Sequence, residues 1–356
     1  MEERPQEGIP DKLAERLAGF CRASLEAAGG LQVQGLSKLS DGWESEIYSF
    51  TARDDSGKAH DLVLRMYPGN PSSAPDRKCE REYTVMRTVW EAGYPVPRVF
   101  GMEKDAAVLG KPFLIMERIR GQSFEAFFNQ AAPSDKPALF RLVVDLFARL
   151  HDLDWRPFWE ALAATSRQGA PEPDTQSLME AELAGYSKLV ADLDEKEYGS
   201  LIGWLVRQLP PVNPAEPSLI HLDFHTRNIL MTQDAKPYVI DWTGAMVSDY
   251  RFDVAWSLIF VDPTMQDDFL SMYRSLSGRD LKDLDYFRAL AWSRRVMSIM
   301  ISIRYGAEKL GMRPGAENVM RRNPRHIESV YRNLLNATGV RLPDVERLLE
   351  ELNRPV

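Results

Sequence analysis

Cysteine and long hydrophobic runs are scarce in this sequence. Only two of its 356 residues are cysteines, Cys21 and Cys79. Two cysteines give neither a disulfide framework nor a cysteine metal cluster, and they fit a reducing cytoplasm. No apolar run reaches the ~18 residues that a membrane span needs, and the start, Met1 to Pro5, lacks the basic-then-apolar order of a signal peptide. We therefore expect a cytoplasmic protein with no membrane partner.

An excess of positive charge is also absent. The formal net charge is −8, which argues against nucleic-acid binding because that function needs a basic surface. The charge is uneven: residues 281–356 carry 14 Lys and Arg against 9 Asp and Glu, a net of +5, which leaves −13 on residues 1–280. The basic run Arg321-Arg322-Asn323-Pro324-Arg325 stands out there. It either forms a solvated helix face, pairs with the acidic remainder, or binds an anionic ligand.

Two familiar phosphate-binding motifs, G-x-x-x-x-G-K-[ST] and G-x-G-x-x-G, are missing as well. Without the first of them, the P-loop nucleotide hydrolases are disfavoured. A zinc hydrolase is a rival class, because His221, Asp223 and His225 stand at alternate positions. Zinc sites usually need another His or Cys nearby. No recognisable ligand pair is formed by the three remaining histidines, which are His60, His151 and His326.

The chain does contain an ordered change from strand-like to helix-like patterns. The first part has a predicted amphipathic helix over 11–28, strands near 31–39, 45–53, 60–67, 98–103 and 113–119, and a helix over 77–92. Beyond Gly121, apolar residues recur at helical spacing in 134–151, 178–195, 251–260, 283–305 and 327–337. The length suits two core-bearing units. We expect an α+β fold with residues 1–120 in one unit and 121–356 in the other.

The most informative segment lies in the helical part. His221-x-Asp223 follows an apolar run, Asn228 stands five positions after Asp223, and a second apolar run ends thirteen positions later in Asp241. Phosphoryl transfer needs this inventory: one carboxylate orients the attacking hydroxyl, while an Asn and a second carboxylate hold Mg²⁺ against the nucleotide phosphates. The flanking strand-like runs would hold these side chains on rigid backbone.

This pattern resembles the kinase-like phosphotransferases of small molecules, the aminoglycoside phosphotransferase and choline kinase relatives of protein kinases. The resemblance spans at least residues 30–260 and implies a two-lobed, protein-kinase-like fold with a small β-rich N-lobe and a larger, mainly helical C-lobe. Asp241-Trp242-Thr243-Gly244 replaces the Asp-Phe-Gly of protein kinases. It resembles the Ile-Asp-Trp form of the small-molecule enzymes, which favours a small substrate over a protein.

The resemblance implies roles in the second lobe. Asp223 is the catalytic residue that orients, and can deprotonate, the acceptor hydroxyl; Asn228 and Asp241 are the Mg²⁺ ligands. His221 is expected to organise the loop. Arg227 either steadies the transferring phosphate or forms a salt bridge within the loop. Three residues are expected to support structure, Asp249 and Asp253 by capping or tying the loop and His151 by packing, and three aromatics to join the core, Phe124, Phe127 and Phe128.

The nucleotide site is expected in the first lobe. Ser40 lies in a loop whose hydroxyls and N–H groups could contact phosphates, although a plain hairpin turn at Asp41-Gly42 fits equally well. Arg65 ends a strand where the related kinases place the cation that contacts the α- and β-phosphates, and an Arg can clamp them bidentately. Its expected partner is Glu82, with Glu80 as the fallback and a surface salt bridge as the alternative. The resemblance alone places the purine against backbone groups of Glu117 to Ile119.

These residues predict an enzyme that moves the γ-phosphate of ATP or GTP to a hydroxyl of a small molecule, with Mg²⁺ as cofactor. We expect the enzyme to be a monomer or a homodimer. An aminoglycoside-like antibiotic is the first expected acceptor. A metabolic kinase acting on choline, homoserine, a sugar or an amine is the alternative. A nucleotide-binding regulator without turnover is a third possibility of another class, which the intact Asp223, Asn228 and Asp241 oppose.

Overall fold

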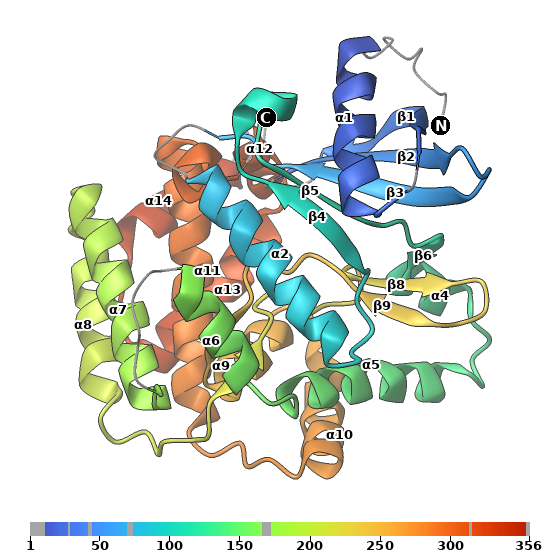
Figure 1. The fold of residues 1–356 in the computed structure, drawn as a ribbon. Helices are drawn as coiled ribbons and strands as arrows, with labels where there is room; N and C mark the ends of the chain where they lie inside the picture. Colours follow the sequence, from blue (N-terminus) through green and yellow to red (C-terminus); the bar gives the residue numbers. More distant parts are fainter. Residues whose placement is uncertain are drawn as a thin grey trace. The chain divides into compact units, whose positions relative to one another are not determined.

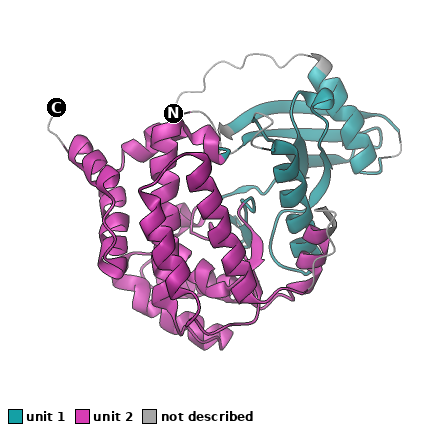
Figure 2. Cartoon of the chain, turned by 90° about the vertical axis from the view of Figure 1, so that its left-hand side faces the viewer, with its two compact units in different colours: residues 1–122, 230–243, 311–314 teal, residues 123–229, 244–310, 315–356 magenta. Residues whose placement is uncertain are grey.

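The structure is a computed structural model that describes residues 11–27, 29–41, 45–69, 74–165, 172–312 and 315–353. The chain divides into two compact units (Figure 2). The first combines Met1–Gln122 with Leu230–Thr243 and Gly311–Pro314. The second comprises Ser123–Ile229, Gly244–Leu310 and Gly315–Val356. A short segment from the middle of the chain therefore belongs to the N-terminal, β-rich unit.

A five-stranded antiparallel sheet forms the centre of the first unit (Figure 1). Its strands, in spatial order, are β1 (Leu31–Asp41), β2 (Glu46–Asp54), β3 (Ala59–Met66), β5 (Phe113–Glu117) and β4 (Val99–Glu103). Successive side chains of a strand point to opposite faces. In β3, Leu62, Leu64 and Met66 therefore share one face, and Val63 and Arg65 share the other.

Helix α1 (Asp11–Ser24) packs on the first of these faces, where Leu17 and Cys21 join Leu62 and Leu64 in a buried core cluster. The helix expected here ends at Ser24 rather than at Ala28. The reason is local: Glu26 adopts a left-handed backbone with φ of 52°, which an α-helix cannot continue through.

Helix α2 (Pro75–Glu91) contacts β4 and β5. Pro75 stands in its first turn, where the missing N–H costs nothing. Cys79, Glu82 and Val89 are on its buried side. The buried carboxylate of Glu82 is unusual for a helix face, because a buried charge is costly without a partner. A four-residue helix, α3 (Ala106–Leu109), follows β4.

A second, smaller sheet has the strand order β6 (Gly121–Ser123), β8 (Ile229–Thr232) and β9 (Pro237–Val239). Gly121 allows the close approach of β6 to β8. A Cβ at this position would meet the carbonyl oxygen of Met231 well inside van der Waals contact. Only glycine fits there without a backbone shift.

The second unit is mainly helical and is organised around one long helix, α11 (Leu284–Tyr305), which is buried along most of its length. Its remaining elements are α4 (Phe124–Gln130), α5 (Lys136–His151), α6 (Arg156–Thr165), α7 (Thr175–Asp192), α8 (Tyr198–Gln208), β7 (Ser218–Ile220), β10 (Met246–Ser248), α9 (Tyr250–Leu258), α10 (Gln266–Ser277), α12 (Ala316–Arg321), α13 (Pro324–Thr338) and α14 (Pro343–Leu352). Helix α11 packs against α8, α9, α12 and α13. An apolar surface on several sides suits a helix that is enclosed by others.

Residues 221–228 form an irregular segment between β7 and β8. Strand β7 pairs with β10 in antiparallel register, Ile220 opposite Met246.

The mixed α+β class and the kinase-like fold expected from the sequence are confirmed. None of the helices in the described residues is long and apolar enough to cross a membrane.

Candidate active site

The loop that carries His221 and Asp223 is tied to helix α9 by one buried carboxylate. Asp253, which is fully buried, accepts hydrogen bonds from the backbone N–H of His221 at 2.7 Å and of Leu222 at 2.8 Å. Leu222 has a left-handed φ of 57°, a conformation that costs free energy for a residue with a Cβ. The two hydrogen bonds to Asp253 offset that cost. The expected tie between Asp253 and the loop is present.

Asp253 is in turn held by His151. The His151 Nε2 atom lies 3.2 Å from Asp253 Oδ2, and Nδ1 lies 2.8 Å from the Tyr273 hydroxyl. Burial lowers the pKa of His151, although the hydrogen bond with Asp253 opposes this, so the imidazole is neutral near pH 7. His151 therefore does more than pack: it links α5, α9 and α10 behind the loop.

Asp223 and Asn228 contact each other at the surface of the second unit. The Asn228 Nδ2 group donates to Asp223 Oδ2 at 2.7 Å and to the Asp223 carbonyl at 2.9 Å. The Asp223 side chain is 39% exposed, and His225 Nε2 lies 3.5 Å from its Oδ1. Asp223 is thus fixed in orientation and still accessible. Because the Asn228 amide donates through nitrogen, its Oδ1 atom remains available as an acceptor or a metal ligand.

Arg65 forms a charge cluster with Glu82 and Asp241 in the first unit. Its Nη2 donates to Asp241 Oδ1 at 2.7 Å, and its Nε lies 3.2 Å from Glu82 Oε2 without the alignment of a hydrogen bond. Burial disfavours the charge, but the two carboxylates outweigh it and hold the pKa of Arg65 well above its ordinary value. Glu82 also accepts from the Tyr67 hydroxyl and from the Trp242 backbone N–H. Glu80, the fallback partner, pairs with Lys104 at 2.9 Å instead.

Asp241 stands just after β9 in a strained backbone conformation. Its φ is 67°, and its side chain is 36% exposed. The next residue, Trp242, is fully buried, donates from Nε1 to the Val239 carbonyl at 3.0 Å and meets the Tyr94 ring edge-on. A buried Trp beside a strained Asp holds the carboxylate at one place on the backbone.

The other residues expected at the nucleotide are less fully defined. The side chain of Ser40 and residues 42–44 lie outside the described part of the chain. The Glu117 N–H donates to the Arg98 carbonyl at 2.8 Å and the Arg118 N–H to the Asp61 carbonyl at 3.0 Å. Among the described residues, no hydrogen-bond partner is found for the Ile119 N–H.

The ion pairs of Arg227 and Asp249 lie outside the loop, whereas ties within the loop were among the expected alternatives. Arg227 forms its ion pair outside the loop, with Glu125 of α4 at 3.1 Å, and its side chain is 73% exposed. Asp249 does not tie the loop. It caps α9 through the Arg251 N–H and forms a buried ion pair with the Arg251 guanidinium at 2.6 Å.

Phe124 belongs to the core as expected, and Phe128 stacks on it at 6.0 Å. Phe127 and Phe128 are half-buried.

The sequence pattern gave no sign of Arg295, on α11. Burial lowers the pKa of this arginine, and the Asp223 carboxylate opposes that shift electrostatically. His326 of α13 accepts a hydrogen bond from Arg295 Nε at 3.1 Å. Neither residue stands at a motif spacing from Asp223, and the only local signal was the basic run just before His326.

The two residues predicted to bind Mg²⁺, Asn228 and Asp241, carry oxygen donors. No group of three or more His, Cys, Asp and Glu residues with metal-ligand geometry occurs in the described ranges. Asn228 Oδ1 and the Asp241 carboxylate are hard oxygen donors, and Mg²⁺ commonly takes one or two protein ligands while water and substrate phosphates supply the rest. Each of these two residues, considered by itself, therefore offers an oxygen of the kind that Mg²⁺ prefers.

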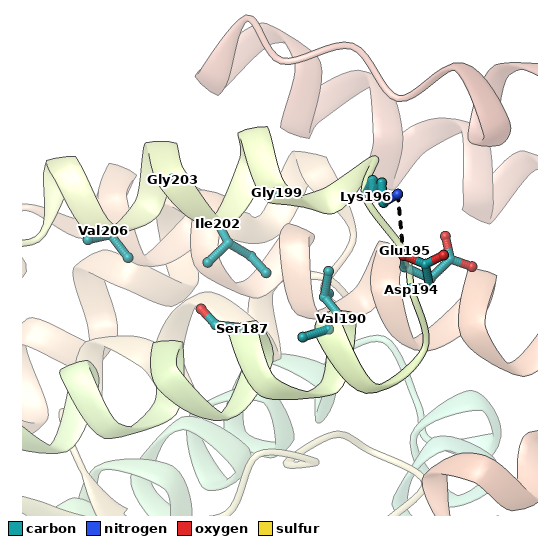
Figure 3. Close-up of a pocket in the computed structure, with 10 residues that line it drawn as sticks. Ser187, Val190, Asp194, Glu195, Lys196, Gly199, Ile202, Gly203 and Val206 are labelled. Carbon is teal, nitrogen blue, oxygen red and sulfur yellow. Dashed lines mark ion pairs between the residues drawn. The ribbon is translucent and has the colours of Figure 1, made fainter.

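A cavity of about 400 Å³ opens elsewhere in the second unit, between α7 and α8. Figure 3 shows Val190, Ile202 and Val206 lining it, with the Lys196–Asp194 ion pair at one end. Its lining includes none of the residues predicted to bind nucleotide or metal.

The first unit has an antiparallel sheet with a buried Arg–Glu pair, and the second unit has an Asp–Asn loop tied to a buried Asp. These features are typical of the kinase-like phosphotransferase class. Residues 35–290 match the model of the phosphotransferase enzyme family, APH. The chain belongs to this family.

Curated relatives are named acyl-CoA dehydrogenases. The Gallus gallus acyl-CoA dehydrogenase family member 11 is 28% identical over 254 residues, which cover 70% of this chain and 30% of the relative. The Arabidopsis thaliana probable acyl-CoA dehydrogenase IBR3 is 28% identical over 58% of this chain and 26% of its own length. The chain thus spans less than a third of these relatives.

Solved structures with a similar fold are aminoglycoside phosphotransferases. A Ralstonia eutropha protein provisionally described as one has a TM-score of 0.62 at 18% identity, with coverage of 95% of this chain and 97% of that chain. The APH(2")-IIa complex with gentamicin has a TM-score of 0.56 at 15% identity, with coverage of 93% and 97%. At these identities the similarity shows the fold.

Proposed function

We propose that the protein transfers the γ-phosphate of ATP or GTP to a hydroxyl of a small molecule. The observation that carries this proposal is the Asp223–Asn228 pair, joined at 2.7 Å on a loop anchored by buried Asp253. Phosphoryl transfer depends mainly on positioning and electrostatic stabilisation. A carboxylate that is fixed by a neighbouring amide and still accessible meets the first of these needs.

Each residue has a distinct role in this proposal. Asp223 orients the acceptor hydroxyl, whose oxygen attacks the γ-phosphorus. The bond from phosphorus to the β,γ-bridging oxygen breaks, the nucleoside diphosphate leaves, and the hydroxyl proton passes to Asp223. Asn228 and Asp241 hold Mg²⁺, which when bound offsets phosphate charge.

The remaining assignments concern the nucleotide. Arg65, kept charged by Glu82, contacts the α- and β-phosphates, and Ser40 contributes from the end of β1, where it pairs with Ile47 of β2 instead of lying in the expected loop. The Ile119 N–H is the free donor for the purine, since the Glu117 and Arg118 N–H groups are already bonded. Glu117 then contributes through its carbonyl. We place this activity in the cytoplasm, which suits two free, buried cysteines.

Two classes of compound are candidates for the acceptor: aminoglycosides and hydroxylated acyl compounds. The fold is shared with an aminoglycoside phosphotransferase whose structure contains gentamicin, at 15% identity. The curated relatives are more similar, at 26–28%, and their names refer to acyl-CoA. That difference favours a hydroxyl on an acyl compound, free or as its coenzyme A thioester, over an antibiotic. Choline, homoserine, sugars and amines are the other metabolic acceptors to include.

The test is an ADP-release assay with MgATP and a panel of these acceptors, including gentamicin and streptomycin. Asp223→Asn should retain MgATP binding and lose turnover by ~10²–10⁴, the range for a positioned acid–base group. Asp234→Asn, an exposed aspartate paired with Lys236, is the matched control and should keep the wild-type rate. Equal rates in Asp223→Asn and wild type would remove Asp223 from the mechanism. Nucleotide binding without turnover of any acceptor would favour a regulator.

A further inference from the structure

Arg295 differs from the other arginines of helix α11 in its partners. Arg288 pairs with Asp285, Arg294 with Glu182, and Arg304 with both Glu195 and Asp344. For Arg295, no carboxylate within ion-pair distance is found in the part of the chain that the structure describes. A partly buried guanidinium without a carboxylate is costly, because a desolvated charge needs compensation.

His326 orients Arg295 without neutralising it. The Arg295 Nε–H donates to His326 Nε2 at 3.1 Å, so the imidazole accepts through that nitrogen. Burial, and then the positive charge of Arg295, lower the pKa of His326 to about 4, which keeps it neutral at pH 7. A guanidinium has five N–H donors in a planar fork. With Nε occupied, the two terminal nitrogens have no hydrogen-bond partner among the described residues.

The neighbours of Arg295 lead to the catalytic aspartate. The Arg295 guanidinium carbon lies 5.9 Å from the centre of the Phe260 ring, which is 38% exposed. The ring of His225 lies 5.0 Å from that of Phe260, and its Nε2 lies 3.5 Å from Asp223 Oδ1. Asp223 also acts electrostatically on Arg295. These contacts therefore form a series that runs from the Asp223 carboxylate through the His225 imidazole and the exposed Phe260 ring to the Arg295 guanidinium.

We propose that Arg295 binds an anionic group, a carboxylate or a phosphate, on the same small molecule whose hydroxyl is oriented by Asp223, with Phe260 against the apolar part between them. This inference rests on the proposed function and specifies its acceptor as an anionic hydroxyl compound. The terminal nitrogens of Arg295 match carboxylate and phosphate oxygens in a bidentate pair. A polycationic aminoglycoside would meet like charge at this position.

The first measurement compares acceptors that differ only in charge. Wild-type protein with MgATP is assayed for ADP release with 3- and 4-hydroxybutanoate, with their neutral amides, with 3-hydroxybutyryl coenzyme A and with gentamicin. We expect kcat/KM for an anionic member to exceed that for its neutral amide by at least about tenfold, as for a charge-assisted hydrogen bond. If the free acids react, the group bound by Arg295 is the carboxylate. If only the thioester reacts, the group bound by Arg295 is a phosphate of the coenzyme.

The second measurement uses variants of helix α11. Arg295→Met should reduce kcat/KM for the anionic acceptor by about tenfold or more, with little change for the neutral amide. Arg295→Lys should recover part of the loss, because it keeps the charge but not the fork. Arg288→Met, on the same helix and paired locally with Asp285, is the control and should leave the preference unchanged.

The outcomes separate this inference from the proposed function. Asp223-dependent turnover with equal preference for acid and amide, or with gentamicin or a neutral compound as the only acceptor, would overturn the role of Arg295 and leave the phosphotransferase proposal intact. An anion preference that survives in Arg295→Met would also overturn it. Absence of any Asp223-dependent turnover would overturn both. The wild-type comparison needs no variant, so poor folding of Arg295→Met does not remove the test.

Discussion

Arg65 is the positively charged residue at the centre of the buried charge cluster of the first unit. It is 6% exposed, and two carboxylates from different segments, Glu82 and Asp241, neutralise it. Asp241 is also a proposed metal ligand, and its Oδ1 accepts a hydrogen bond from Arg65 Nη2 at 2.7 Å. An arriving phosphate would compete with Asp241 for the same guanidinium. Nucleotide and metal binding are therefore expected to depend on each other.

Substitution of Arg65 should weaken ATP binding. Arg65→Met removes a charge-assisted phosphate contact worth roughly 1.5–3 kcal/mol, and so at least about a tenfold loss of affinity is expected. Arg65→Lys should retain part of the affinity. Calorimetric titration with MgATP measures both. Lys104→Met, which breaks the exposed pair with Glu80, is the control. An unchanged affinity in Arg65→Met would move the phosphate clamp elsewhere.

At the scale of residues, spacing along the chain singled out Asp223, Asn228 and Asp241 as candidates, because they share one continuous segment. The resemblance to the kinase-like family predicted that Arg65 and Glu82 form a pair, and the structure places Nε of Arg65 3.2 Å from Oε2 of Glu82. Arg295 and His326 could not be found this way. They come from α11 and α13, and side chains from helices distant in sequence meet only through tertiary packing.

Among the secondary-structure elements, the strands of the first unit were predictable because alternation of apolar and polar residues has a period that only a strand satisfies. Several helices of the second unit were not. Helix α8 contains Gly199 and Gly203, which lower its intrinsic helix propensity by ~1 kcal/mol each. It forms because Leu201 and Leu205 are fully buried. Packing of that kind is not visible in local sequence.

The close approach of β6 to β8 predicts a large effect of one methyl group. Gly121→Ala places a Cβ against the Met231 carbonyl, so it should lower the free energy of unfolding by about 1–3 kcal/mol, as for an overpacked site. Gly185→Ala is the matched control, because it lies within α7 with no atom within 4 Å of an added Cβ. It should be neutral or stabilise by ~0.5–1 kcal/mol. Denaturant unfolding of both variants measures the contrast, and equal stabilities would contradict it.

For the molecule as a whole, the buried His151 and the half-buried His326 connect stability to pH. His151 and His326 both have a lowered pKa in the folded state, in each case first through burial. The unfolded chain therefore binds protons at a higher pH than the folded chain does. Stability is retained above the unfolded pKa and is lost as the pH falls toward the folded pKa.

His326→Gln should make the protein less sensitive to acid. In wild type, the contribution of His326 to the free energy of unfolding is lost as the pH falls from about 6.5 to about 4. The stability of His326→Gln relative to wild type should therefore rise over this interval. Unfolding curves at pH 8, where both side chains are neutral, give the baseline for the comparison. A constant difference between the two proteins from pH 8 to pH 4 would show that His326 titrates normally.

The first unit is built from separate segments of the chain, which has a consequence for its synthesis on the ribosome. Residues 230–243 belong to this unit, but they are made only after its first 122 residues and 107 more (229 − 122). Asp241 follows Arg65 by 176 residues (241 − 65), so at ~5–20 residues per second Arg65 waits roughly 9–35 s for Asp241 to be made. During that time Glu82 lacks the Trp242 backbone N–H that donates to it in the folded chain. A stop codon before residue 241 would remove Asp241 from the ion pairs of Arg65 and leave the pair with Glu82.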